Sequence, residues 1–334
     1  MTPSPLVLAP ILKEKVWGGR ALERVGKLLP PGKNIGESWE LADLASTSAD
    51  GGGGDAAHSE IAHGPMRGMT IADAVRAMGA NLLGRVALTP TGGFPLLVKF
   101  LDARENLSVQ VHPSPVYAAA NPGAHLKTES WYILGAEPGA VIYKGVKPGV
   151  TREAFAAHIA DGTVVNDLIA VPAIPGELHH LPSGTCHALG AGVLVAEVQT
   201  PSDTTFRVFD WGRTGRTLHV AQALECIRFG PPEKLAGERA GPGERTLLVS
   251  TPFYALAELR LAPNTPHTIR VGGAAPRVWM VLEGEGELCA EAGEFAPLHL
   301  RAGETTLFPA AMPAARFTTS GASAAKVLEV LLPH

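Results

Sequence analysis

The sequence is poor in cysteine, with three in 334 residues: Cys186, Cys226 and Cys289. They lie far apart and show no paired spacing, which argues against a disulfide scaffold and against a cysteine-rich zinc site. Such cysteine usage is typical of a reducing compartment. We therefore expect the protein in the cytoplasm.

Long apolar runs are missing as well. No stretch reaches the roughly 20 apolar residues that a membrane-spanning helix requires. The first residues, "MTPSPLVLAPILKEKVWGG", do not combine a basic leader with a long apolar segment. The sequence predicts a soluble protein that has no membrane partner.

A surplus of positive charge is the third feature that the chain lacks. The formal net charge is −4, whereas nucleic-acid-binding proteins usually carry a basic surface. We expect no nucleic-acid partner, although local basic spots can still bind small anions. The four-glycine loop Gly51–Gly54 is not followed by the Lys-Ser or Lys-Thr of a phosphate loop, which argues against a nucleotide site there.

Glycine and proline, by contrast, are abundant, with 38 and 28 residues. Together with 46% hydrophobic and 18% charged residues, they favour a mainly β protein of short strands joined by turns. Apolar spacing after Thr70 and after Thr151 predicts two helices in the first half. The length favours two domains, and the Pro/Gly/Glu-rich segment 230–244 places the boundary between 1–235 and 236–334.

An internal repeat in the sequence, called the sequence echo below, supports two related β-barrels. The segment "GELHHLPSGTCHA" from Gly176 parallels "GETTLFPAAMPAA" from Gly303, and in each a proline comes six residues after the glycine. Upstream, "SWYILGAEPGA" from Ser130 parallels "VWMVLEGEGEL" from Val278. The longer spacing in the first copy fits a helical insertion. Duplication of a small barrel explains the pattern better than one large sheet.

Candidate metal ligands occur in the first copy only. In "LSVQVHP", strand alternation places Ser108, Gln110 and His112 on one face. Glu129 and His187 follow, and their counterparts in the second copy are Arg277 and Ala314. Two neutral imidazoles and a carboxylate suit a divalent first-row metal, with an amide oxygen completing an open site, and zinc is the first choice. Each histidine alone also fits an ordinary hydrogen-bonded core residue.

Six motifs, in this order, resemble the short bacterial form of the type I mannose-6-phosphate isomerases of the cupin superfamily. They are "VWGGRAL" (Val16–Leu22), "GESWEL" (Gly36–Leu41), "LSVQVHP" (Leu107–Pro113), "LKTESWYIL" (Leu126–Leu134), "LPSGTCHAL" (Leu181–Leu189) and "SDTTFRVFDWGR" (Ser202–Arg213). The resemblance covers the first 230 residues, and the remainder agrees as a degenerate second barrel. Longer relatives often read His-Lys-Pro-Glu where this chain has "LKTE".

The resemblance implies two cupin-type jelly-roll barrels and one zinc ion per chain, bound by Gln110, His112, Glu129 and His187. It also implies an aldose–ketose isomerase that interconverts mannose 6-phosphate and fructose 6-phosphate. In that reaction a proton moves between C1 and C2 through an enediol, while the metal stabilises the developing oxyanion. The implied partner is a small sugar phosphate, and the expected assembly is a monomer or weak homodimer.

Further residues of these motifs receive expected roles. Lys127 relays protons or holds phosphate, and Arg207 offers a fork suited to phosphate or an enediolate. Asp203 orients Arg207 or shuttles protons. Glu197 is a further acid or base. Ser108 donates a hydrogen bond from its hydroxyl to a phosphate oxygen, or simply fills its place on the strand. Without a functional role, Lys127 would be a solvated surface lysine, and Asp203 and Arg207 would form a surface ion pair.

Other polar and aromatic residues are not expected to take part in catalysis or metal binding. Trp17 and Trp39 should pack in the core, and His179 and His180 should form a solvent-facing loop pair. Two other functions remain open. A metal-dependent oxygenase of the same fold is disfavoured because Glu129 lies 17 positions after His112 (129 − 112). A sugar-phosphate-binding regulatory protein without turnover is disfavoured by Lys127, Asp203 and Arg207.

Overall fold

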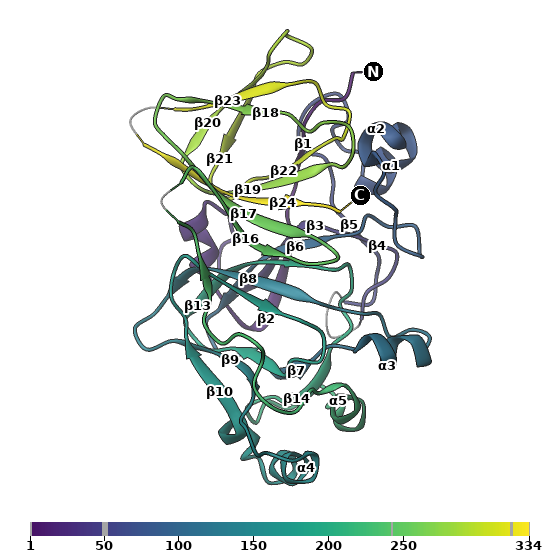
Figure 1. Ribbon diagram of the computed structural model, residues 1–334, viewed down its shortest axis with the longest axis vertical. Helices are drawn as coiled ribbons and strands as arrows, with labels where there is room; N and C mark the ends of the chain where they lie inside the picture. The colour runs from purple at the N-terminus through teal and green to yellow at the C-terminus, as the bar shows by residue number, and fades with distance from the viewer. Residues whose placement is uncertain (1, 49–52, 242, 321–322, 334) are drawn as a thin grey trace.

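Two β-barrels, each built from a large and a small antiparallel sheet, make up the computed structural model. It describes residues 2–48, 53–241, 243–320 and 323–333. The first barrel fills the lower half of Figure 1, mostly in teal, and the second fills the upper half, in green and yellow. The predicted mainly β fold, with a few helices in the N-terminal part, is confirmed.

The first barrel carries the helices and the longer loops. Its large sheet has the order β15 (Glu238–Arg239), β11 (Glu177–Leu181), β8 (Glu129–Ala136), β13 (Val193–Gln199), β6 (Leu97–Ala103), β3 (Ile35–Leu41), β2 (Ile11–Gly19). Its small sheet has the order β10 (Leu168–Pro172), β9 (Val141–Val146), β12 (His187–Leu189), β7 (Val109–Val111), β14 (Phe206–Phe209). A separate short pair is formed by β4 (Asp43–Leu44) and β5 (Ala57–His58).

The second barrel repeats this plan. Its large sheet has the order β1 (Leu6–Leu8), β22 (Thr305–Phe308), β19 (Arg277–Glu283), β24 (Ala325–Leu331), β17 (Ala255–Leu261), β16 (Arg245–Ser250). Its small sheet has the order β18 (Pro266–Ile269), β23 (Ala315–Thr319), β20 (Glu285–Ala290), β21 (Leu298–Arg301). Strands β22, β19, β24 and β17 thus follow the order of β11, β8, β13 and β6. The two segments of the sequence echo lie on equivalent strands.

Each barrel takes one edge strand from outside its own repeat. Strand β1, at the start of the chain, pairs with β22 of the second barrel, where Leu6 lies opposite Leu307. Strand β15 pairs with β11 of the first barrel, where Glu238 lies opposite Leu178. Neither 1–235 nor 236–334 therefore holds every strand of one barrel. The division at residue 235 stays a prediction about independent units.

Apolar layers explain how the sheets stack. The largest core lies between the two large sheets, with Phe100 and Ala196 from the first barrel and Met280 and Leu328 from the second, all fully buried. A second core fills the interior of the second barrel. A third lies between the small sheet of the first barrel and the helices that cover it, and it includes Phe155. A fourth joins apolar residues of the large and small sheets of the first barrel.

Capping residues define where the helices begin. The helices are α1 (Ile71–Met78), α2 (Ala80–Leu83), α3 (Pro115–Ala120), α4 (Arg152–Asp161) and α5 (Val220–Cys226), with 3₁₀ turns η1 (Ala21–Val25) and η2 (Val164–Asp167). Thr70 and Asp73 form a capping box, and Thr151 caps α4, as predicted. The single helix expected after Thr70 is interrupted at Gly79, whose φ is +50°. None of the helices described is long and apolar enough to cross a membrane.

Candidate metal centre and cavity

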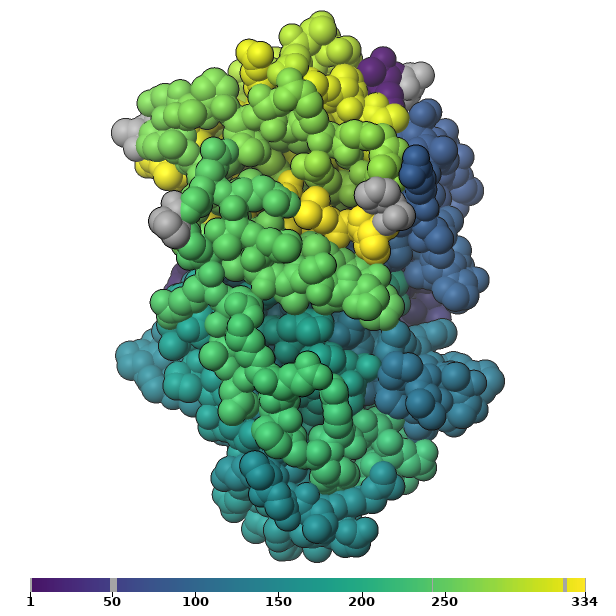
Figure 2. All heavy atoms as spheres, viewed as in Figure 1, coloured from purple at the N-terminus to yellow at the C-terminus, as the bar shows by residue number. Residues whose placement is uncertain are grey.

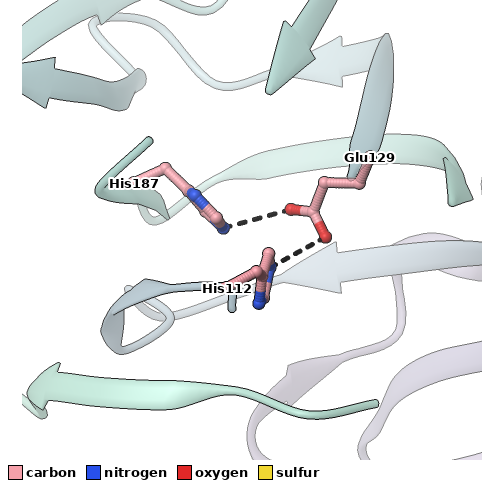
Figure 3. A group of neighbouring side chains, drawn as sticks. All are labelled: His112, Glu129 and His187. Carbon is pink, nitrogen blue, oxygen red and sulfur yellow. Dashed lines mark hydrogen bonds and ion pairs between the residues drawn. The ribbon is translucent and has the colours of Figure 1, made fainter. Parts of the chain in front are cut away.

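Strand pairing brings the four predicted ligands together inside the first barrel. Gln110 on β7 lies opposite His187 on β12. His112 follows directly after β7, and Glu129 is the first residue of β8 in the facing sheet. Figure 3 shows the side chains of His112, Glu129 and His187 pointing toward one another from separate segments of the chain. Residues up to 77 positions apart in sequence thus meet at one place.

The three strongest candidates form a tight and buried group. Nε2 of His112 lies 3.1 Å from Oε2 of Glu129, and Nε2 of His187 lies 3.1 Å from Oε1. The possible ligand atoms all lie within 4.8 Å of one another. No water-exposed surface remains on Glu129, and 1% remains on each histidine. The spacing suits one small cation among the three side chains.

The hydrogen bonds of the outer ring nitrogens explain why a cation fits. Nδ1 of His112 faces the carbonyl of Thr204 at 3.2 Å, and Nδ1 of His187 faces that of Thr185 at 2.8 Å. A carbonyl only accepts, so each Nδ1 donates its proton, and a neutral ring then holds a lone pair on Nε2. Both lone pairs face the carboxylate of Glu129. A metal ion between these acceptors removes the conflict, and metal-binding histidines commonly donate their second nitrogen in this way.

The pKa shifts favour the protonation states that metal binding needs. Burial, helped by the charge of Lys127, lowers the pKa of His112 to about 3, so this ring is neutral. Burial alone would raise the pKa of Glu129, but attraction from Lys127 and the two histidines outweighs it and holds that pKa well below its usual range. Oε1 of Glu129 is buried and has no hydrogen-bond partner in the described part of the chain. The centre offers a carboxylate and at least one neutral imidazole.

Gln110, the fourth predicted ligand, lies beside His187. Its Nε2 lies 3.3 Å from Nε2 of His187, and its Oε1 accepts a hydrogen bond from Ser108 at 3.4 Å. The two ends of a side-chain amide differ little in shape, and their assignment follows from the hydrogen-bond network. With the oxygen turned toward His187, the amide nitrogen can donate to Ser108, which can also accept. Gln110 therefore fits as an oxygen ligand.

A cavity of about 490 Å³ opens beside this centre. Its wall includes all the remaining predicted residues, namely Ser108, Gln110, Lys127, Glu197, Asp203 and Arg207. Lys127 is nearly buried, and its Nζ lies 3.0 Å from Glu129, so it is not a solvated surface lysine. Arg207, on β14 opposite Gln110, donates from Nη1 to the carbonyl of Thr217 at 2.7 Å. Asp203 accepts from the backbone N–H and the hydroxyl of Ser48 at 2.5 and 2.9 Å.

Four charged residues of the cavity wall were missed by reasoning from the sequence, namely Lys15, Glu37, Lys99 and Arg216. Nζ of Lys99 lies 3.2 Å from Glu197 and 3.5 Å from Glu37. Burial opposes the charge on Lys99, but attraction from Glu197 and Glu37 outweighs it and raises the pKa of Lys99. Burial also opposes the charge on Glu37, yet Lys99 and Lys15 lower its pKa to about 2. The available signal was a charged residue inside an apolar strand, as in "LLVKFL".

The two tryptophans pack as predicted, with 3% of Trp17 and none of Trp39 exposed, and both also line the cavity. The glycines beside them allow strands β2 and β3 to approach closely, since a Cβ on Gly18 would overlap the backbone of Gly36. The expectation for His179 and its neighbour is wrong. His179 is fully buried in β11, opposite Trp131 of β8. The Pro and Gly after this segment suggested a loop, but strand pairing extends to residue 181.

Comparison with known proteins gives three findings. A family model described as phosphomannose isomerase type I, catalytic domain, matches residues 6–138. A mannose-6-phosphate isomerase of Streptococcus mutans is 32% identical over 318 residues, covering 91% of this chain and 92% of the relative. A crystal structure of the mannose 6-phosphate isomerase from Bacillus subtilis aligns with a TM-score of 0.83 and 28% identity, over 98% of this chain and 99% of that one.

A more distant structural neighbour was solved with zinc. This mannose 6-phosphate isomerase, described as the zinc-bound holo form, aligns with a TM-score of 0.75 and covers 99% of this chain and 100% of its own. Sequence identity is 18%, so this likeness concerns the fold. The two-barrel architecture is therefore shared along the full length of the chain.

Proposed function

This chain belongs to the type I mannose-6-phosphate isomerase family, and we propose that it interconverts mannose 6-phosphate and fructose 6-phosphate in the cavity of the first barrel. The observation that carries the proposal is the group of His112, Glu129 and His187, in which buried acceptor atoms face one another at 3.1 Å. Without a cation this arrangement is unfavourable. The cavity beside it supplies room for a sugar phosphate.

Gln110, His112, Glu129 and His187 would hold a zinc ion, the metal named for the structural neighbour. Imidazole nitrogen and carboxylate or amide oxygen are suitable zinc ligands, and the cavity beside them leaves access for substrate. When bound, the zinc ion supplies a Lewis acid for the oxygen atoms at the C1 and C2 end of the sugar. The chain's own residues bind the substrate and carry the proton.

Positive side chains determine how the substrate is oriented. Lys127 lies beside Glu129, and Arg207 lies opposite Gln110 in the small sheet, so both flank the metal centre. Moving the carbonyl from C1 to C2 builds negative charge on the two oxygens of an enediolate. Lys127 is placed to stabilise that charge, and Arg207 offers a planar fork to it or to the phosphate. Ser108 adds a hydroxyl donor at the same wall.

A carboxylate of the wall carries the proton between C1 and C2. We assign this role to Asp203, which lies on the cavity and is oriented by two hydrogen bonds from Ser48. Glu197 is held at both oxygens, by the indole N–H of Trp131 at 2.9 Å and by Lys99 at 3.2 Å. We therefore assign Glu197 a positioning role, which is to keep Lys99 charged at the cavity wall.

The decisive test combines metal analysis with a coupled isomerase assay. His187→Ala should lose zinc and lower kcat/KM by about 100-fold or more, because a ligand is removed from a small site. His299→Ala is the matched control, since His299 is an exposed histidine of the second barrel paired with Glu285. An H187A protein that keeps both zinc and activity contradicts the assignment.

Isotope exchange separates turnover from mere binding. An isomerase that works through an enediol exchanges the hydrogen at C2 with solvent, so deuterium from the solvent should enter the sugar phosphate. Asp203→Asn should reduce this exchange much more than it weakens substrate binding. Binding of mannose 6-phosphate with neither product nor exchange would instead identify a regulatory binding protein. Consumption of oxygen would identify an oxygenase.

The setting of this activity is also proposed. We place the enzyme in the cytoplasm, which is supported by the three cysteines, all of them free thiols. We propose a monomer or weak homodimer. Sedimentation of the purified protein at several concentrations tests the second point.

A further inference from the structure

A second, smaller cavity lies where the first barrel meets the chain that leads to the second. Its volume is about 120 Å³, roughly a quarter of the 490 Å³ cavity. Lys144 of β9 and His180 of β11 line one side, and Arg228 and Lys234 of the following segment line another. Val249 of β16 contributes from the second barrel. In Figure 2, green atoms of this part of the chain cover both barrels on the side facing the viewer.

Lys144 is the unusual member of this cavity. Only 3% of the residue is exposed, yet none of the described residues forms a hydrogen bond or ion pair with its ammonium group. An ammonium group that is largely withdrawn from bulk water loses hydration free energy unless a counter-charge replaces it. Most buried lysines avoid this cost by pairing with a carboxylate, as Lys99 does with Glu197 in this chain. Glu238 of the same wall attracts Lys144 but is paired with Lys234, so a bound anion would supply the missing negative charge.

The other charges leave an excess of positive charge. Lys234 is already paired with Glu238. The guanidinium of Arg228 makes no ion pair or hydrogen bond with the described residues, although its backbone N–H donates to Gly184 at 2.8 Å. Glu233 is the remaining acid of the wall, and it is exposed, so its carboxylate can turn toward solvent. Lys144 and Arg228 thus approach the cavity as two cations from two segments.

We propose that this cavity binds a small oxyanion, either inorganic phosphate or the phosphate group of a larger metabolite, between Lys144 and Arg228. An ammonium and a guanidinium are the two side chains that most often bind phosphate, one as a point charge and the other as a bidentate fork. The small volume admits a phosphate group and leaves a whole hexose phosphate to the larger cavity. None of the residues that line this cavity lines the larger one or belongs to the proposed ligand group.

The position of the site connects it to both barrels. Lys144 lies opposite His187 across the β9–β12 ladder. His180 hydrogen-bonds through Nδ1 to Ser130 at 2.9 Å, and Ser130 in turn contacts Tyr254 of the second barrel at 3.1 Å. An anion here joins β9, the segment after Cys226 and β16. It should therefore stabilise the junction of the barrels as well as the strand beside a proposed ligand.

The test is equilibrium dialysis of the zinc-loaded protein against radioactive inorganic phosphate, with saturating fructose 6-phosphate to block the larger cavity. The wild type should retain one phosphate site per chain. Arg228→Met and Lys144→Met should weaken it by about tenfold or more. Lys147→Met is the matched control, because Lys147 is an exposed lysine near the end of the same strand, and it should bind as the wild type does.

Two results would overturn the proposal. One is that the wild type binds no phosphate under these conditions, and the other is that the wild type and R228M bind phosphate equally. The exposed Arg228 keeps the test valid even where K144M fails to fold, and R228M should retain full isomerase activity. If fructose 6-phosphate does not bind the larger cavity, the proposed function fails. The phosphate site of the smaller cavity is then still identified, because R228M weakens it. Adding glycerol phosphate shows the source: displacement indicates an organic phosphate, and no displacement indicates the free ion.

Discussion

The two barrels share one buried pair and differ in what surrounds it. In the first barrel the indole of Trp131 donates to Glu197 at 2.9 Å. In the second, the indole of Trp279 donates to Glu329 at 3.3 Å, from the equivalent strands β19 and β24. Because both copies keep this pair while one lacks the candidate ligands, the pair belongs to the fold. This supports the positioning role assigned to Glu197.

The differences between the barrels lie around that pair. Lys99 is the cross-strand neighbour of Glu197, whereas Ala257 is the neighbour of Glu329. Glu129 begins β8, whereas Arg277 begins β19 and pairs with Glu329 at 3.3 Å. Aromatic side chains occupy the interior of the second barrel, where Trp279 contacts Phe308 and Phe317 with ring centroids 5.2 and 5.8 Å apart. One copy is packed for stability, and the other keeps polar side chains around a cavity.

Among the residues that differ between the two barrels, Lys99 should have the largest effect on stability. Replacing it by methionine leaves Glu197 and Glu37 buried beside each other with less compensating charge. Breaking a buried ion pair typically costs about 3–5 kcal/mol, so K99M should lower the free energy of unfolding by about that amount. Denaturant unfolding of the zinc-loaded protein measures it.

The double variant K99M/E197Q serves as the control for this loss. Removing the carboxylate charge as well should recover part of the stability, since the uncompensated charge and not the lost volume causes the damage. Equal stability of the single and double variants would show that Lys99 acts through packing. It would also weaken the distinction between the two barrels.

The next prediction concerns how the stability of the first barrel depends on pH, through Glu37. Burial opposes its ionisation, but Lys99 and Lys15 lower its pKa to about 2 from an ordinary value of 4.5. A carboxyl group with a lowered pKa stabilises the fold above the unfolded-state pKa, and this stability is lost as pH falls from about 4.5 to about 2. Glu37→Gln should therefore flatten the fall of unfolding free energy in that window. The exposed Glu60→Gln should leave it unchanged, and a slope equal to wild type in E37Q would contradict the shift.

The sequence predicted the ligand group because one local pattern and one comparison, that between the two copies, were available. Alternation placed Gln110 on the same face as Ser108 and His112, and the similarity between the two copies separated Glu129 and His187 from features that belong to the barrel. The cluster of His112, Glu129 and His187 agrees with that prediction. The capped starts of α1 and α4 were predicted for a similar reason, because a cap depends on residues three positions apart.

The features that were missed depend on contacts distant in sequence. Lys99 meets Glu37 and Glu197 because β6 lies between β3 and β13, and no local pattern specifies that order. The exchange of β1 and β15 was missed for the same reason, since three apolar residues from Leu6 to Leu8 do not identify their partner. The burial of His179 follows from pairing with β8, which overrides the turn-forming residues after it.

The tryptophan–glutamate pair that both barrels share allows the same substitution to be compared in each barrel, with a smaller expected effect. Trp131→Phe and Trp279→Phe each remove one indole donor from a buried carboxylate, which should cost about 1–3 kcal/mol. The cost should be lower in W279F, because Glu329 keeps ion pairs with Arg245 at 2.9 Å and Arg277 at 3.3 Å. W131F alone should weaken zinc retention against a chelator, because the Trp131 ring packs edge-on against His187 at 5.3 Å. Equal zinc loss in both variants would contradict the separation.

Arg277 should show the smallest effect, although it stands where the first barrel has Glu129. Its side chain is 30% exposed, and Arg245 and Trp279 continue to compensate Glu329 when it is removed. A partly exposed pair with a second cation nearby contributes about 1 kcal/mol or less, so Arg277→Ala should change the unfolding free energy by no more than that. Zinc content should stay at one per chain. A loss as large as that expected for K99M would mean that the second barrel depends on its own buried charge network, and the division between a packed copy and a polar copy would then fail.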